Sequence, residues 1–242
     1  MKLSRNLLFV ITILALVLAA CAPAATTAPE PTAVPTEVPT EVPAEEPPAG
    51  LTCAEPVKVG LITDVSGALA IYGAHILRSF MLGMEYVAGA PGSAGEVFDF
   101  KAVQENTFMV EGCEIQVFVR DDAGNPENTA TIARELIDVQ KVNVLVGTAS
   151  SGATATLQGI ALESKIPLIV APAAANDITG VNFNEYTFRT SRNNYQDAIN
   201  ECAYLTKQYK TFVQIAPDYA FGRGSAAAFR DACTLNGGTF VM

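Results

Sequence analysis

Short apolar runs alternate with longer amphipathic stretches along the chain after residue 50. The first run, at residues 57–62, ends in Thr-Asp-Val-Ser-Gly and is followed by a helical pattern from Tyr72 to Val87. Residues 89–112 are rich in glycine and then alternate, which predicts a loop and a hairpin insertion. Further strands are expected at 114–119, 142–147 and 166–170, and further helices at 126–139 and 150–163. Strands and helices that alternate at this spacing predict an α/β domain with a mostly parallel sheet.

The pattern begins again near the end of the chain. Strands are expected at 186–189, 211–215 and 238–241, and helices at 196–208 and 224–235. The chain stops inside the last strand, so a second lobe has too few strands for a full sheet. The sequence therefore looks like the front of a longer protein or a truncated gene. We expect a first α/β lobe at 51–190 and a partial second α/β lobe at 191–242.

A short apolar segment at the amino terminus predicts export. Lys2 and Arg5 precede an apolar run at residues 7–20, which closes with Leu-Ala-Ala before Cys21. The run is shorter than the roughly 20 residues that cross a bilayer as a helix, and its small last residues suit a peptidase. The pattern resembles the bacterial lipobox, with an uncleaved anchor as the alternative. The resemblance implies a lipoprotein signal peptide at 1–20, lipidation of Cys21, and an extracytoplasmic protein anchored to the bacterial cell membrane, at the cell surface or in the periplasm.

The segment at 21–50 is expected to be a linker. It repeats Pro, Thr, Glu and Val and contains no aromatic residue. Such a composition cannot bury much apolar area and favours an extended polyproline II conformation. It would hold a folded part away from a membrane surface.

The expected folded part is acidic. Residues 51–242 contain 13 Lys and Arg against 20 Asp and Glu. A nucleic-acid-binding protein needs the opposite sign of charge, so we expect no nucleic acid partner. No second long apolar run follows, so contact with the membrane is expected through the lipid anchor only.

Four cysteines remain after Cys21, and an even number outside the cytoplasm favours disulfides, with three possible connectivities. Cys53 lies just before the first strand and Cys113 just before the second. Neighbouring parallel strands bring their starts within about 5–6 Å, which a disulfide bridges. Cys202 and Cys233 fall on the two helices that flank the strand at 211–215. We therefore predict that Cys53 pairs with Cys113 and Cys202 with Cys233.

Three loops are expected at one edge of the sheet, at 63–73, 148–152 and 171–176. In an open α/β sheet, ligands bind outside the carboxyl ends of the strands, where helix N-termini offer free N–H groups. These loops are rich in hydroxyl and small residues and contain no Lys or Arg. They predict a site where a Ser hydroxyl and backbone N–H groups hold a small anionic group.

The sequence does not favour an enzyme. The segment at 147–152 lies where a nucleophile elbow would, but it lacks the G-x-S-x-G register, and the only histidine, His75, is expected near a different loop. No G-x-G-x-x-G follows the first strand, and there is no Walker A lysine. The acidic segment at 121–125 lacks the spacing of a calcium loop, and no C-x-x-C is present for zinc. We expect no cofactor and no metal.

Six segments carry a resemblance to a known family. In chain order they are TDVSGALAIYG, VRDDAGNPENTATIAREL, VLVGTASSGATAT, IPLIVAPAAANDIT, FRT and PDYAFGRG. In this order and spacing the chain, from Val57 to its last residue, resembles the type I periplasmic binding proteins. It is most similar to the leucine/isoleucine/valine-binding family, the substrate-binding proteins of branched-chain amino acid ABC transporters. The resemblance implies two α/β lobes that close on a ligand.

The resemblance also implies ligand-binding residues in the first lobe. The family has a Ser at the start of the helix after the third strand, which holds the ligand carboxylate; it matches Ser151, with Ser150 as the alternative. The next loop supplies a carbonyl group, which matches that of Ala173, and a Thr, in whose place this chain has Ala175. The backbone N–H survives there and the hydroxyl is lost, which argues against a simple α-amino acid as ligand.

Two aromatic residues complete the implied site. Tyr72 matches the aromatic residue of the first loop, and Phe221 stands where the family usually has Tyr. The family's acidic residue for the ligand ammonium group would lie beyond residue 242. The plainer alternatives are that Ser151 only caps its helix, and that Tyr72 and Phe221 only pack. Arg189 and Arg192 are expected to brace the crossing between the lobes rather than contact the ligand.

The expected function is that of a solute-binding lipoprotein of an ABC importer. It would bind a small polar ligand, such as an amino acid, an amide or a short carboxylate, and present it to permease subunits. We expect a monomer and no enzymatic activity. The alternative is a ligand-sensing lipoprotein of the same fold that signals to a receptor or a kinase.

Overall fold

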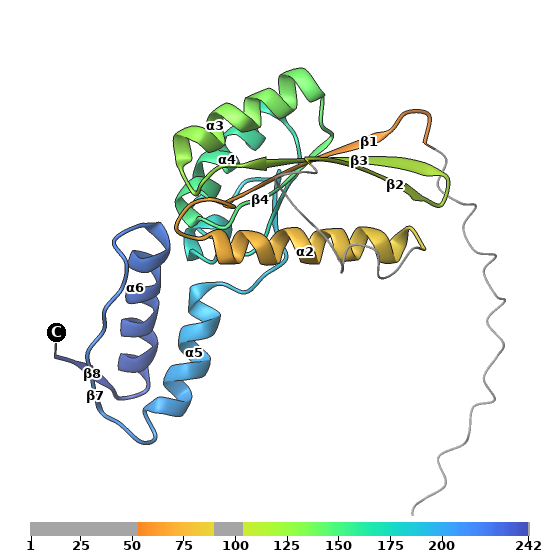
Figure 1. The fold of residues 1–242 in the computed structure, drawn as a ribbon. Coiled ribbons are helices and arrows are strands. Elements are labelled where there is room, and N and C mark those ends of the chain that lie inside the picture. The colour runs from red at the N-terminus through yellow and green to blue at the C-terminus, as the bar shows by residue number, and fades with distance from the viewer. Residues whose placement is uncertain (1–52, 90–103, 242) are drawn as a thin grey trace, which may run out of the picture. The chain divides into compact units, whose positions relative to one another are not determined.

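The computed structural model describes residues 53–89 and 104–241. The expected signal peptide, Cys21 and the linker, together with much of the expected insertion at 89–112, lie outside the described residues. All described elements belong to one unit, Pro47–Met242. In chain order (Figure 1) they are β1 (Val57–Thr63), α2 (Ala70–Val87), β2 (Glu105–Val110), β3 (Cys113–Asp121), α3 (Pro126–Glu135), the π-helical turn η1 (Leu136–Gln140), β4 (Val144–Gly147), α4 (Ser151–Ser164), β5 (Leu168–Val170), the 3-10 turn η2 (Asn176–Thr179), β6 (Thr187–Arg189), α5 (Asn194–Leu205), β7 (Thr211–Phe212), α6 (Ala220–Leu235) and β8 (Thr239–Phe240).

Six strands form one sheet in the order β2-β3-β1-β4-β5-β6. β1 lies parallel to both β3 and β4, and β5 lies parallel to β4 and β6, while β2 is antiparallel to β3. The predicted mostly parallel sheet is therefore confirmed. The strand found in the expected insertion, β2, forms its hairpin with β3, the strand predicted at 114–119. β6, the strand with which the sequence pattern begins again, pairs with β5 and completes this first sheet.

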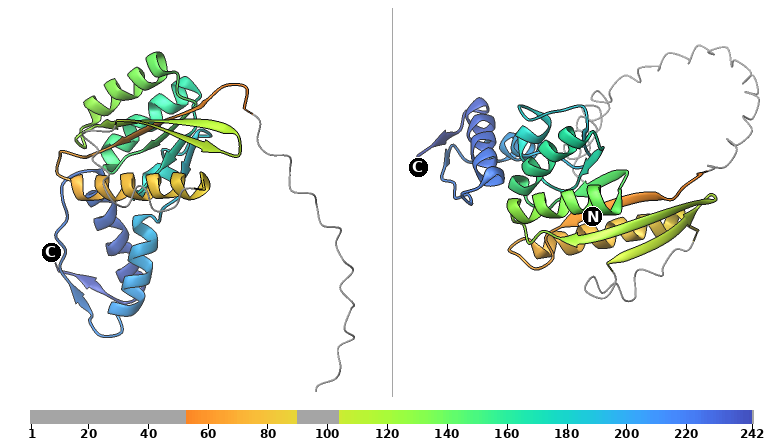
Figure 2. Two further views of the ribbon diagram at one scale, coloured as in Figure 1. Left: turned by 45° about the vertical axis from the view of Figure 1, so that its right-hand side comes forward. Right: turned by 90° about the horizontal axis from the view of Figure 1, so that it is seen from above.

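The sheet has a helix layer on each face (Figures 1 and 2). Because successive side chains of a strand point to opposite faces, Leu61 packs with Leu77 and Met81 of α2, whereas Ile62 packs with residues of α3 and α4. On the second face, Leu136 and Leu157 are fully buried against β4 and β5. This double coverage explains why the central strands have almost continuous apolar sequences.

The elements from α5 onward form a smaller cluster. β7 and β8 pair in parallel as a separate two-stranded sheet, and α5 and α6 pack against each other. Their core contains only alanines and cysteines at its fully buried positions, with aromatic rings packed around it: Ala198, Cys202, Ala228, Ala232 and Cys233.

Both expected disulfides are present. Cys53 joins Cys113 with a Cα–Cα distance of 5.2 Å, and Cys202 joins Cys233 with one of 4.8 Å. The first ties the chain before β1 to the start of β3, and the second ties α5 to α6. None of the helices in the described ranges is long and apolar enough to span a membrane.

Several element boundaries differ from those expected. α5 begins at Asn194 rather than at residue 196, because Asn193 and Gln196 form a capping box at its start. α6 begins at Ala220 rather than at 224, so two glycines lie inside its first turns. One of them, Gly222, is placed so that an added Cβ would lie 1.8 Å from the carbonyl oxygen of Pro217. The sequence analysis began this helix at Gly224, whereas the close approach at Gly222 requires a glycine inside its first turn.

Candidate functional site

The three loops that were predicted to carry the site follow neighbouring strands. β1, β4 and β5 are adjacent in the sheet, and α2, α4 and the loop at 171–176 follow their carboxyl ends. The loops therefore lie side by side at one edge. This part of the prediction depends only on the parallel strand order, which the structure shows.

Two buried carboxylates hold these loops in place. Asp64, after β1, accepts hydrogen bonds from the N–H groups of Gly67 and Leu69, the latter at 2.8 Å. Asp122, after β3, accepts hydrogen bonds from the hydroxyls of Thr148 at 2.7 Å and Thr129 at 3.0 Å. Neither carboxylate has exposed surface. The loops that lead into α2 and α4 are thus fixed by side chains below them.

Burial is the largest influence on the ionisation of Asp122. It raises the pKa of Asp122 above its ordinary value, and the nearby Asp64 carboxylate raises it further. Hydrogen bonds from Thr148, Gly124 and Thr129 lower the pKa, but they do not cancel the rise that burial causes. The surroundings of Asp122 therefore disfavour its charged form relative to a carboxyl group in water.

The two candidate serines at the start of α4 have different roles. Ser150 is the N-cap, and its Oγ accepts the N–H of Ala153 at 3.4 Å. Ser151 is the first residue of the helix, and its Oγ accepts the N–H of Ala175 at 3.2 Å. Capping is therefore the role of Ser150, and the interpretation that Ser151 serves only as a cap is wrong. Ser151 instead joins α4 to the loop after β5.

The Ala175 peptide is held from both sides. Its N–H donates to Ser151, and its carbonyl oxygen accepts a hydrogen bond from the guanidinium of Arg189 at 2.8 Å. Arg189 also donates to the hydroxyl of Thr179. Ala173, Ala174 and Ala175 are all buried, so this part of the loop offers backbone groups and methyl groups, and the polar side chain of the loop is that of Asn176.

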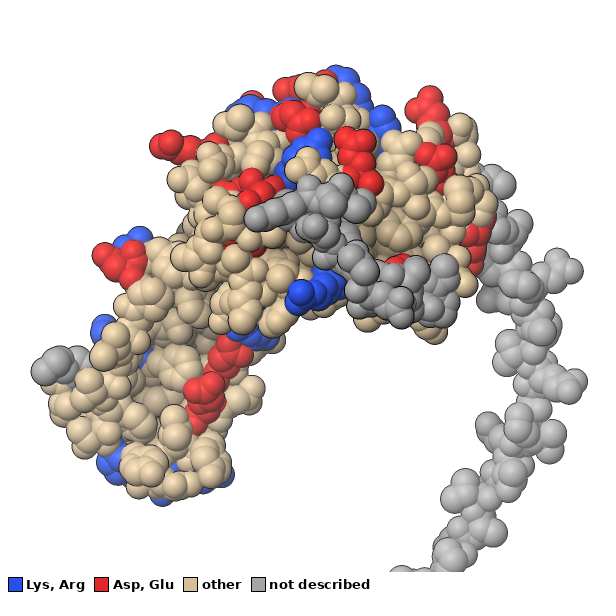
Figure 3. Space-filling view, in the orientation of Figure 1, with Lys and Arg blue, Asp and Glu red and all other residues tan. Residues whose placement is uncertain are grey.

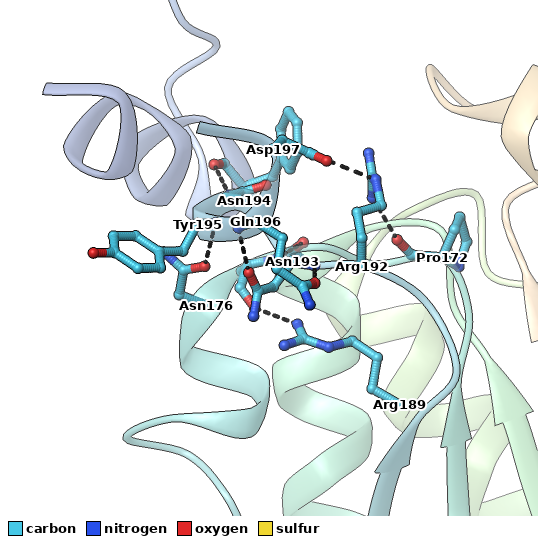
Figure 4. A network of polar contacts seen from close by, with 12 residues as sticks. Pro172, Asn176, Arg189, Arg192, Asn193, Asn194, Tyr195, Gln196 and Asp197 are labelled. Carbon is cyan, nitrogen blue, oxygen red and sulfur yellow. Dashed lines mark hydrogen bonds and ion pairs between the residues drawn. The ribbon is translucent and has the colours of Figure 1, made fainter. Parts of the chain in front are cut away.

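Both arginines of the crossing segment bond to this region, as the sequence predicts (Figure 4). Arg192 donates to the carbonyl oxygen of Pro172 at 3.4 Å and pairs with Asp197 at 3.3 Å. Burial lowers the pKa of Arg189, and the positive charge of Arg192 lowers it further. The guanidinium groups of Arg189 and Arg192 thus place positive charge beside the loop at 171–176, which itself contains no Lys or Arg.

Asn194 was not among the predicted site residues. It is only 1% exposed, its N–H donates to the carbonyl oxygen of Ala174 at 2.9 Å, and its Nδ2 donates to that of Phe221 at 3.1 Å. The neighbouring Tyr195 N–H donates to Oδ1 of Asn176 at 3.0 Å. The sequence signal was weak, because two consecutive asparagines after a strand also indicate an ordinary helix cap.

Aromatic residues approach from α2 and α6. Tyr72, in the first turn of α2, is 53% exposed, so it does not belong to the core. Phe221 lies half-buried in the first turn of α6, and its ring centroid is 6.0 Å from that of Tyr219. Burial raises the pKa of Tyr219, and the nearby Tyr72 raises it further. Tyr219, which sequence reasoning missed, therefore lies beside Phe221 as a further aromatic residue of this region.

This arrangement suits a small anion with an apolar body. Hydroxyl and backbone N–H groups lie at the start of α4, where the helix dipole favours negative charge. Aromatic faces offer apolar contact and ring stacking. The described residues contain no group of three or more His, Cys, Asp or Glu that could hold a metal ion.

Comparison with known proteins identifies the family. The sequence model of the family described as periplasmic binding protein matches residues 56–242. The chain belongs to this family. Within it, the branched-chain amino acid binding proteins are the group that the chain resembles, and family membership implies an extracytoplasmic location.

Three relatives illustrate the likeness. A Leu/Ile/Val-binding protein homologue of Brucella melitensis is 23% identical over 76% of this chain and 46% of its own length. A solute-binding protein of an ABC transporter from Rhodopseudomonas palustris, solved with 3,4-dihydroxybenzoic acid, is 30% identical with a TM-score of 0.63 over 76% of this chain and 46% of its own. An ABC-type branched-chain amino acid transporter protein from the same species is 33% identical with a TM-score of 0.59, over 76% and 45% of the two chains. The chain thus spans about half the length of these periplasmic binding proteins.

Acidic and basic side chains are interspersed over the face of the molecule shown in Figure 3, without a continuous basic surface.

The comparisons indicate solute-binding proteins of ABC transporters and no catalytic family.

Proposed function

We propose that this periplasmic binding protein binds a small carboxylate at the edge formed by the loops after β1, β4 and β5, and serves an ABC importer. The contact between Ser151 and Ala175 carries the proposal. Because Oγ of Ser151 accepts the Ala175 N–H, its own hydroxyl hydrogen is left to point elsewhere. A hydroxyl oriented in this way at the start of a helix is suited to donate to a ligand carboxylate.

We further propose that an aromatic carboxylate is preferred over an α-amino acid. An ammonium group needs acceptors, and of the three alanine carbonyl oxygens in this loop those of Ala174 and Ala175 already accept hydrogen bonds from Asn194 and Arg189, which leaves that of Ala173. Residue 175 offers no hydroxyl as a further acceptor. The aromatic residues Tyr72, Tyr219 and Phe221 instead suit a planar ring, and a related structure was solved with 3,4-dihydroxybenzoic acid.

Calorimetry with benzoate, 4-hydroxybenzoate and leucine tests this preference. The protein should be a longer one that contains this chain together with a complete second lobe, with the 242-residue chain in parallel. We expect the benzoates to bind at least about tenfold more tightly than leucine, which corresponds to about 1.4 kcal/mol. The 242-residue chain should bind weakly, since it spans only 46% of the length of the Brucella melitensis relative. Leucine binding more tightly than either benzoate would refute the preference.

The adjacent serines provide a matched pair of variants. Ser151→Ala removes a charge-assisted hydrogen bond, so the dissociation constant for benzoate should rise about 10- to 100-fold. Ser150→Ala removes only the helix cap and should lower the unfolding free energy by about 1 kcal/mol while changing the affinity little. Equal affinity in the wild type and Ser151→Ala would show that the carboxylate lies elsewhere.

We propose that the protein acts as a monomer that is tethered through a lipid on Cys21 and presents its ligand to permease subunits. The lipobox pattern at residues 18–21 and the Pro-rich segment behind it support this proposal. In a bacterium fed labelled palmitate the protein should become labelled, and Cys21→Ala should be released into the soluble fraction. Labelling that persists in Cys21→Ala would contradict the anchor.

A further inference from the structure

One buried side chain connects the two halves of the candidate site. Asn194 stands between the loop at 171–176, which belongs to the edge of the first sheet, and the first turn of α6 (Figure 4 shows Asn194 with its neighbours). Its backbone N–H reaches Ala174 at 2.9 Å, and its side chain reaches the carbonyl oxygen of Phe221 at 3.1 Å. Residues 174 and 221 are far apart in sequence, so these two bonds bring distant segments together.

Asn194 is itself held in place. It is the first residue of α5, and the preceding Asn193 closes a capping box with Gln196, in which each side chain bonds the other residue's N–H. The following residue, Tyr195, donates its N–H to the side chain of Asn176. The start of α5 therefore has hydrogen bonds besides those of Asn194, whose own side chain is confined by its burial and by its bond to Phe221.

The start of α6 is also closely fitted. Gly222 approaches the Pro217 carbonyl so closely that a Cβ would lie 1.8 Å from its oxygen, and a Cβ on Gly224 would lie 3.5 Å from Nδ2 of Asn194. The position of Phe221 therefore depends on how its backbone sits against Asn194. A change in this one contact would be transmitted to the ring of Phe221.

We propose that Asn194 is a positioning residue that couples the loop at 173–176 to the aromatic residues at the start of α6. The inference rests on the proposed function, since the loop at 173–176 holds Ser151, the proposed carboxylate contact, and the start of α6 supplies the ring contacts. Loss of the side chain would release the start of α6 from this connection, while the backbone bond to Ala174 remains. A structural role confined to α5 would instead lower stability without reaching either segment.

Two variants separate these roles. Asn194→Leu keeps the side-chain size and the backbone hydrogen bond to Ala174 but removes the donor to Phe221. Asn193→Ala removes the capping box of the same helix and leaves both bonds of Asn194 in place. The readouts are amide hydrogen exchange of the ligand-free 242-residue chain, benzoate affinity of the longer protein, and melting temperature.

For Asn194→Leu we expect faster exchange in the segment 219–223, little change in the segment 173–176, which keeps its hydrogen bond to the backbone of residue 194, and benzoate affinity weaker by about 5- to 20-fold. For Asn193→Ala we expect a lower melting temperature with little change in either segment or in affinity. Unchanged exchange at 219–223, or unchanged affinity in a protein that binds benzoate, would overturn the coupling. If the wild type binds no carboxylate, the proposed function fails, but the exchange experiment still decides the coupling.

Discussion

At the residue scale, Asp122 is a buried carboxyl group whose surroundings oppose its ionisation. Burial raises its pKa above the ordinary value of 3.8, against the effect of its hydrogen bonds. The folded protein therefore keeps a proton on Asp122 in a pH range where the unfolded chain has released it. The resulting stabilisation is fully present below pH 3.8 and is lost as the pH rises through the folded pKa.

Asp122→Asn should remove this dependence. The unfolding free energy of the variant, relative to the wild type, is expected to rise as the pH is raised from about 4 to 7. Urea unfolding at several pH values measures this difference in unfolding free energy. The change of the difference with pH tests the assignment even if the variant is less stable than the wild type at every pH. A difference between variant and wild type that stays constant with pH would contradict the assignment.

Asp121 gives a control of opposite sign. Burial alone would raise the pKa of Asp121, but hydrogen bonds from the side chain of Ser66 and from the N–H groups of Val65, Ala123 and Ser66 outweigh it and lower the pKa below 3.8. Its stabilisation is therefore present above pH 3.8 and is lost as the pH falls through the folded pKa. The loss of unfolding free energy caused by Asp121→Asn should therefore be smaller in acid than at neutral pH.

The two serines show what sequence reasoning could and could not decide at this scale. The positions of Ser150 and Ser151 follow from the end of a strand and the start of a helix. Which of them caps the helix depends on a one-residue shift in where the helix begins, and boundaries are less certain than elements. The partner of Ser151 lies 24 residues away, and no local pattern contains that information.

At the scale of elements, α2 carries two glycines with opposite demands. Gly73 packs against the loop after β1, so that an added Cβ would lie 1.5 Å from the carbonyl oxygen of Asp64. Gly83 lies on the same helix with no atom within 4 Å of an added Cβ. The sequence predicted this helix from its apolar periodicity, but periodicity does not tell a tightly packed glycine from an exposed one.

This contrast makes a prediction within one helix. Gly83→Ala should raise the unfolding free energy by about 0.5–1 kcal/mol, because alanine favours the helix. Gly73→Ala forces the backbone apart and should lower it by about 1–3 kcal/mol or more. Gly73→Ala should also weaken benzoate binding, since it displaces Tyr72. Chemical unfolding of both variants checks the prediction, and stabilisation by both would show that α2 lies further from the loop.

At the scale of the whole molecule, the sequence predicted what parallel strand order determines. Cys53 and Cys113 precede neighbouring strands, and the three loops follow neighbouring strands, so their proximity follows from topology. The contacts of Asn194 follow instead from how α5 and α6 pack beside the loops of the six-stranded sheet. That packing depends on how side chains that are far apart in the sequence fit together, and the hydrophobic periodicity of a sequence contains no information on such pairs.

The central claim is that a carboxylate ligand lies at the start of α4. A crystal structure of the longer protein with benzoate tests it most directly. We predict that the benzoate carboxylate lies within hydrogen-bonding distance, about 2.5–3.0 Å, of Ser151 Oγ, with its ring beside Tyr72 and Phe221. Benzoate bound away from Ser151, or with its carboxylate turned toward other residues, would contradict the account.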